Sequence, residues 1–278
     1  STAPTFHPTN NGPAVIIATE YLFTIGTPML THYYYVPSTN DLTNTNNWWS
    51  NSNGTGNHPA NFTISNTVFN IPSNQTLNST WTVSGTNSSV RVTNGSTLTL
   101  EGTLTGRLSA DGGTTINLNT SSAPAFYQLN SASTVNINVA GTVPQAVYGN
   151  LNLGTGNKTL PISSTSVVGN LQISDQVTLN GSTAPDRSTL IVAGNITFQG
   201  NSGAPPAENQ RYSLVLDGVG SHTISVNGTN IALAGLDAEG TINLNFNDSN
   251  PHSITVGIPG GSGGLLLRSG STLNLNQH

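Results

Sequence analysis

The chain has 278 residues, of which only 6% are charged, against about 25% in an ordinary globular protein. Six basic residues and a formal net charge of −5 argue against nucleic acid or an anionic membrane surface as a partner. The absence of cysteine excludes a disulfide scaffold and a cysteine-based metal site, and no apolar run of about 18 residues could span a membrane as a helix.

The first 60 residues differ in composition from the rest and are predicted to form an N-terminal unit (1–60) ahead of a solenoid (61–278). Residues 13–18 and 21–25 are the most apolar stretches, and residues 31–36 are aromatic. A stack of repeats needs a cap over its open end, and this unit is predicted to supply one. The alternative is that it contains a strand that one subunit donates to another.

Residues 37–60 are rich in asparagine, serine and glycine, which is typical of a loop. Trp48 and Trp49 are adjacent in this loop. Paired tryptophans in a polar loop are candidate contacts for a sugar ring. The alternative is that they pack over the first rung as a lid, because large aromatic side chains are usually buried over much of their area.

From residue 61 onward, apolar residues recur at every second position, which predicts short strands with one buried face. No segment has the 3.6-residue period of a helix. A polar loop is predicted at 201–211. The predicted strands are residues 67–71, 81–85, 89–93, 96–100, 115–119, 134–138, 213–217, 222–226, 230–233, 241–246, 253–256 and 265–268, followed by a final strand within 270–275.

A Gly-Asn-aliphatic motif occurs three times, beginning at Gly149, Gly169 and Gly194, with offsets of 20 (169 − 149) and 25 (194 − 169) residues. In addition, the hexapeptide at 95–100 recurs with one change at 270–275. Self-similarity at this period, with alternating strands, predicts stacked β repeats. A single unit of this kind cannot bury its apolar face, whereas a stack of units can.

The predicted fold is therefore all-β, a parallel β-helix (β-solenoid) with an N-terminal capping or donor-strand segment. The alternative is an antiparallel β-sandwich, because the Asn-Gly pairs at Asn94, Asn180 and Asn227 suit hairpin turns. Within the solenoid, asparagine, serine and threonine are predicted to form hydrogen-bonded ladders between rungs on the outer surface.

No nucleophile, phosphate-binding or metalloprotease motif occurs, and the six histidines have no metal-ligand spacing. The sequence therefore predicts no enzyme, cofactor or metal. The best carboxylate candidate is the pair Asp237 and Glu239, at alternate positions of one segment; the alternative is that both are solvated turn residues. Asp175 and Asp186 flank one coil.

Several segments carry a family resemblance. The segments at 44–48, 53–56 and 58–62, and the run from Tyr148-Gly-Asn-Leu-Asn-Leu through Lys158-Thr-Leu-Pro to Val168-Gly-Asn-Leu-Gln-Ile, resemble secreted adhesin-like β-solenoid surface proteins of Bacteroidota. The resemblance covers roughly residues 40–200 and lies at the level of repeats. It implies an extracellular or cell-surface location and a structural role, with no specific ligand.

The favoured functional hypothesis is an extracellular structural protein that polymerises head to tail into a surface fibre. The alternative is a monomeric adhesin that binds glycans through Trp48, Trp49 and the tyrosines at 33–35. A second alternative is a polysaccharide-degrading enzyme with Asp237 and Glu239. The predicted subunit interface comprises Val15, Ile16, Ile17, Tyr21, Leu22 and Phe23 at one end, and Leu265, Leu266, Leu267, Leu273 and Leu275 at the other.

Overall fold

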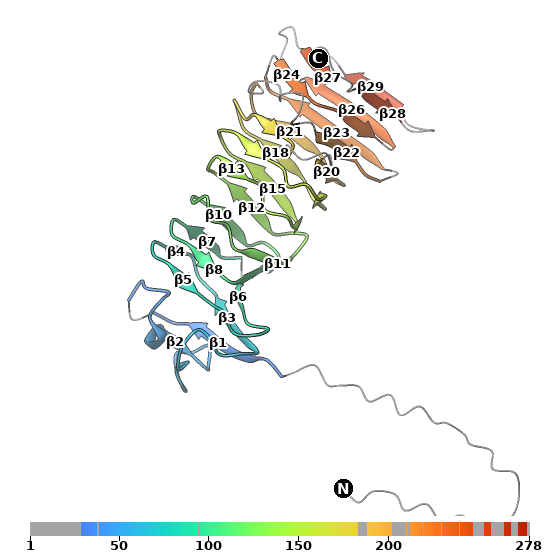
Figure 1. Cartoon of the computed structure of the whole chain (residues 1–278). Helices are drawn as coiled ribbons and strands as arrows, with labels where there is room; N and C mark the ends of the chain where they lie inside the picture. Colours follow the sequence, from blue (N-terminus) through green and yellow to red (C-terminus); the bar gives the residue numbers. More distant parts are fainter. Residues whose placement is uncertain are drawn as a thin grey trace, which may run out of the picture.

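A computed structural model gives the fold of most of the chain (Figure 1). The residues that it describes are 29–37, 39–93, 95–182, 188–201, 210, 212–218, 220–228, 230–238, 240–246, 253–256, 264–267 and 272–276. The apolar segment 13–25 and most of the predicted loop at 201–211 lie outside these residues.

The strands stack in parallel into an elongated solenoid, which runs from the blue N-terminal rungs to the red C-terminal rungs in Figure 1. In most rungs the chain passes through a strand on a first face, then one on a second face, then a short one on a third. The predicted parallel β-helix is confirmed. The alternative antiparallel sandwich is wrong, because the single antiparallel pair among the described residues is β1 with β2.

The first face consists of two six-stranded sheets that adjoin where β11 contacts β14. Its strands are β1 (Thr31–Tyr35), β2 (Trp48–Trp49), β3 (Thr67–Ile71), β6 (Ser89–Val92), β9 (Arg107–Ala110), β11 (Ala125–Leu129), β14 (Val147–Tyr148), β17 (Thr165–Val167), β20 (Ser188–Val192), β22 (Tyr212–Leu216), β25 (Leu236–Ala238) and β28 (Leu265–Leu267). A 3₁₀ turn, η1 (Thr45–Asn47), precedes β2.

The second face is one ten-stranded sheet, and the third face carries three small sheets. The second face comprises β4 (Gln75–Leu77), β7 (Thr97–Leu100), β10 (Thr115–Leu118), β12 (Thr134–Ile137), β15 (Asn150–Leu153), β18 (Leu171–Ile173), β21 (Ile196–Phe198), β23 (Ser221–Val226), β26 (Thr241–Phe246) and β29 (Thr272–Asn276). The third comprises β5 (Trp81–Thr82), β8 (Leu104–Thr105), β13 (Gly141–Thr142), β16 (Lys158–Thr159), β19 (Leu179–Asn180), β24 (Asn230–Leu233) and β27 (Ser253–Val256).

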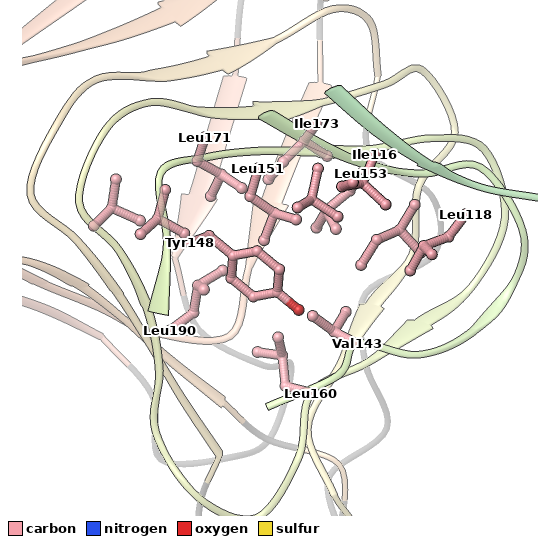
Figure 2. Close-up of a cluster of buried hydrophobic side chains, with 14 of the residues drawn as sticks. Ile116, Leu118, Val143, Tyr148, Leu151, Leu153, Leu160, Leu171, Ile173 and Leu190 are labelled. Atoms are coloured by element: carbon pink, nitrogen blue, oxygen red, sulfur yellow. The ribbon is translucent and has the colours of Figure 1, made fainter. Parts of the chain in front are cut away.

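Aliphatic residues in register fill the interior of the solenoid. Leu98, Ile116, Val135 and Leu151 are aligned on four neighbouring strands of the ten-stranded sheet, and none is exposed. Side chains from different faces meet in the centre of each rung; in Figure 2, Leu151, Leu171 and Leu160 lie around the ring of Tyr148. Because the side-chain period of a strand is two, the polar residues between these aliphatic ones point away from the core.

The Gly-Asn motif marks the turn into the ten-stranded sheet. Gly149, Gly169 and Gly194 precede the neighbouring strands β15, β18 and β21. A Cβ atom on Gly194 would lie 2.2 Å from the carbonyl oxygen of Gly169, so the rungs can approach this closely only at glycine. The following asparagines join the turns: Asn150 Oδ1 accepts from the Asn170 N–H (2.9 Å), and Asn170 Oδ1 from the Asn195 N–H (3.0 Å).

The hexapeptide repeat, like the Gly-Asn motif, marks strands of the ten-stranded sheet. Its two copies contain β7 and β29, which lie near opposite ends of the ten-stranded sheet. The described part of the N-terminal unit also belongs to this stack, because β1 pairs in parallel with β3 across the predicted boundary at residue 60. Residues 29–60 are thus the first rung of the solenoid and its covering loop.

Candidate assembly surfaces at the ends of the solenoid

The rung formed by β27, β28 and β29 exposes side chains at positions that are buried elsewhere. Each of these strands is an edge strand of its sheet within the described residues. Leu275 aligns with Leu244 on the preceding rung, yet Leu275 is 64% exposed and Leu244 only 9%. Leu273 aligns with the fully buried Ile242 and is itself only partly buried. The core therefore reaches the end surface without a covering rung in the described part of the chain.

The neighbouring strand β28 adds to this apolar end surface. Leu265 aligns with Leu236, and its exposed fraction is 44% against 5% for Leu236. Leu266 occupies an outward position, aligned with Asp237, and is 58% exposed. Leu267 lies in the same strand. The predicted interface leucines thus come together at one end of the solenoid, where unpaired strand edges favour pairing with another chain. The predicted interface residues in 13–25 lie outside the described residues.

The N-terminal end of the solenoid is closed by aromatic side chains. The rings of Trp48, Phe62, Phe69 and Trp81 pack edge to face or tilted, with centroids 5.1 to 6.2 Å apart. The indole N–H of Trp48 donates to the Leu42 carbonyl at 2.9 Å, and the indole has no exposed surface. The strand β2 covers the outer edge of β1.

The burial of Trp48 corrects its prediction as a glycan contact, because a ligand has no access to a fully buried ring. Trp48 instead packs over the first rung as a lid, which was the alternative prediction for this residue. Trp49 is partly buried and packs against His58 in a tilted arrangement, with ring centroids 3.9 Å apart. Of the three tyrosines at 33–35, Tyr35 is buried and Tyr33 packs on Phe69, so Trp49 and Tyr34 remain as the accessible candidates of this group.

Polar ladders run along the outer side of the ten-stranded sheet, as predicted. The Asn117 amide donates to Thr99 Oγ1 (3.1 Å), Asn136 donates to Asn117 (2.7 Å) and Asn152 donates to Asn136 (2.7 Å). On the last described rungs, Asn274 donates to Asn243 at 2.9 Å. These uncharged side chains hold neighbouring rungs together, so the lateral surface needs few ionic groups.

The single lysine of the chain is part of the interior. Lys158 has no exposed surface, and its ammonium donates to the carbonyls of Val139 (2.7 Å) and Thr155 (2.8 Å). Desolvation lowers its pKa from 10.5 to about 8. Burial raises the pKa of the Tyr148 and Tyr212 hydroxyls above the ordinary value of 10.0.

These shifts predict how stability depends on pH. Between pH 8 and 10.5 the unfolded chain holds the Lys158 proton that the folded chain releases, so the free energy of unfolding should rise with pH in this window. Above pH 10.0 the two tyrosines reverse the trend, because they ionise only in the unfolded chain. Urea titrations from pH 7 to 11 should show the rise in the wild type and its loss in Lys158→Met; an unchanged slope in the variant would contradict this assignment.

The carboxylates proposed for catalysis are not brought together within the described residues. Asp237 lies on β25 and is aligned with Val215 and Leu266, while Glu239 and Asp186 lie outside the described part of the chain. Asp175 Oδ1 accepts from the Asn201 N–H at 2.8 Å and so connects two turns. Among the described residues, no three histidine, aspartate or glutamate side chains cluster as metal ligands would.

Within the described ranges, no helix has the length and apolar character of a membrane span. Comparison of the chain with protein families, with curated proteins and with solved structures finds no match.

Proposed function

We propose that the protein is an extracellular structural subunit that polymerises head to tail into a surface fibre. The observation that carries the proposal is the uncovered C-terminal rung, where Leu275 occupies a core position and is 64% exposed. Within the described residues, each of the three strands of this rung, β27, β28 and β29, has one edge without a partner strand. Solenoid ends are normally covered to prevent association, and an exposed strand edge with apolar side chains favours pairing with a strand of another chain.

The proposed partner for this end is the apolar segment 13–25 of a neighbouring copy. Residues 21–25 alternate Tyr21, Phe23 and Ile25 with Leu22 and Thr24, which suits a five-residue strand beside β29 (Thr272–Asn276). The aromatic closure of the other end favours this arrangement, because the core residues Trp48 and Phe69 of the N-terminal rungs are fully buried, whereas the core position Leu275 is exposed. A contact between unlike ends generates an open fibre when its rotation does not close a ring.

Electron microscopy and sedimentation of three single variants test the proposal. We expect fibres from the wild type and single particles from Phe23→Asp and from Leu275→Asp, because each variant places a charge in an apolar contact. The control is Val147→Asp, which changes a residue that is 59% exposed on the side of the solenoid and should leave the fibres intact.

Single particles from the wild type as well as the variants would contradict polymerisation. That result would favour the monomeric adhesin, for which the partly buried Trp49, packed against His58, is the supporting observation. An extracellular location is part of the proposal and is supported by the very low charge content and by the resemblance to secreted surface proteins.

A further inference from the structure

The outer surface of the first face carries a groove near the N-terminal end of the solenoid. The groove has a volume of about 710 Å³ and is lined by residues of the neighbouring strands β1, β3, β6, β9 and β11. Its size falls in the range of about 300–1,000 Å³ found for ligand sites. A second depression, of about 480 Å³, adjoins it, and Arg107 and Asn87 line both. The two together form an elongated surface that suits a chain-like ligand.

Both arginines of the described residues lie in this groove. The chain has five arginines, and the two that the structure describes, Arg91 and Arg107, both line the groove. The Arg91 Nε donates to Asp111 Oδ1 at 2.8 Å, so this arginine is neutralised by its neighbour. Arg107 has no carboxylate partner among the described residues. Its guanidinium is therefore available to an anionic ligand.

An exposed aromatic ring adjoins this free charge. The guanidinium carbon of Arg107 lies 4.8 Å from the ring centre of Tyr127, and Tyr127 is 55% exposed. The cation–π contact fixes the orientation of both side chains. An arginine fork binds a planar carboxylate with two parallel hydrogen bonds. An exposed aromatic ring next to it offers an apolar surface to the C–H face of a sugar.

We propose that this groove binds an acidic polysaccharide, with a uronate carboxylate on Arg107 and the sugar ring on Tyr127. The Asn87 amide lines the same groove and is placed to exchange hydrogen bonds with sugar hydroxyls. The site is independent of the proposed polymerisation.

Isothermal titration of the full chain with polygalacturonate fragments tests the proposal, with dextran as the neutral probe and dextran sulfate as the sulfated probe. We expect the wild type to bind polygalacturonate more tightly than either of the other two. Arg107→Gln should weaken binding about tenfold or more, because it removes a charge-assisted hydrogen-bond pair. Tyr127→Ala should weaken it as well, whereas Tyr127→Phe keeps the ring and should bind like the wild type.

The matched control is a substitution that removes a negative charge from the groove instead of a positive one. Asp111→Asn removes a negative charge from the groove and should bind polygalacturonate at least as tightly as the wild type. Thermal unfolding of each variant checks that these exposed substitutions leave the fold intact. No binding by the wild type, equal or tighter binding of dextran or dextran sulfate, or unchanged affinity in Arg107→Gln would each overturn the proposal.

Discussion

Trp48→Ala is expected to lower the free energy of unfolding of the N-terminal rungs by about 3–5 kcal/mol. The side chain is fully buried, and its ring contacts Tyr35, Phe62, Phe69 and Trp81. Removal of the indole leaves a cavity over the first rung, and the buried Leu42 carbonyl loses its hydrogen-bond donor. Urea unfolding followed by near-ultraviolet circular dichroism measures the loss, because this signal reports the packing of the aromatic cluster.

The adjacent residue provides the control for this prediction. Trp49 has the same chemistry and the neighbouring position, but it is only partly buried and packs against His58. Trp49→Ala should therefore cost about 1 kcal/mol or less. Equal losses in the two variants would contradict the assignment of Trp48 as the lid of the solenoid. Because contacts in a solenoid are local, we expect the C-terminal rungs to keep their stability in both variants.

Gly194→Ala is expected to destabilise the middle of the solenoid by about 1–3 kcal/mol or more, because it forces neighbouring rungs apart. The added Cβ would lie 2.2 Å from the Gly169 carbonyl oxygen and 2.6 Å from its carbon, and backbone atoms cannot move aside as a flexible side chain can. The displacement would also lengthen the Asn170 Oδ1 contact to the Asn195 N–H. Hydrogen exchange around β18 and β21 measures the local loss.

Gly220→Ala is the matched control, because a Cβ at Gly220 meets no atom within 4 Å. This variant should be neutral or stabilised by about 0.4–1 kcal/mol, since alanine restricts the unfolded chain. If Gly194→Ala were as stable as Gly220→Ala, the close approach of rungs at the Gly-Asn motif would be disproved.

The ten-stranded sheet was predictable from sequence because each of its strands has one face in the core and one in solvent. Strands such as β12 and β26 therefore show clear period-two alternation, and the Gly-Asn motif gives their stacking order. The short strands of the third face, such as β13 and β16, have only two residues and carry no such period. The strand β11 was missed as well, because its register shifts between Phe126 and Gln128 and its residues are mostly exposed.

The candidate sites also differ in how far the sequence predicts them. The end leucines could be predicted because they form apolar runs in a polar chain. The groove could not, because Arg91, Arg107 and Tyr127 are separated by 16 (107 − 91) and 20 (127 − 107) residues and meet only when rungs stack. The signal that the sequence did contain is that these separations are close to the length of one rung. The sequence favoured the lid over the ligand contact for both tryptophans, because large aromatic side chains are usually buried, but it could not tell that Trp48 is fully buried and Trp49 only partly.

Fibre diffraction from aligned wild-type assemblies tests the central claim most directly, because the claim is that rungs continue from one subunit into the next. The strands of the solenoid lie across its long axis (Figure 1). We predict a reflection at about 4.8 Å along the fibre axis, from the spacing between parallel strands, and its loss in Leu275→Asp. Assemblies with this spacing perpendicular to the fibre axis, or preparations that contain no fibres, would contradict the account.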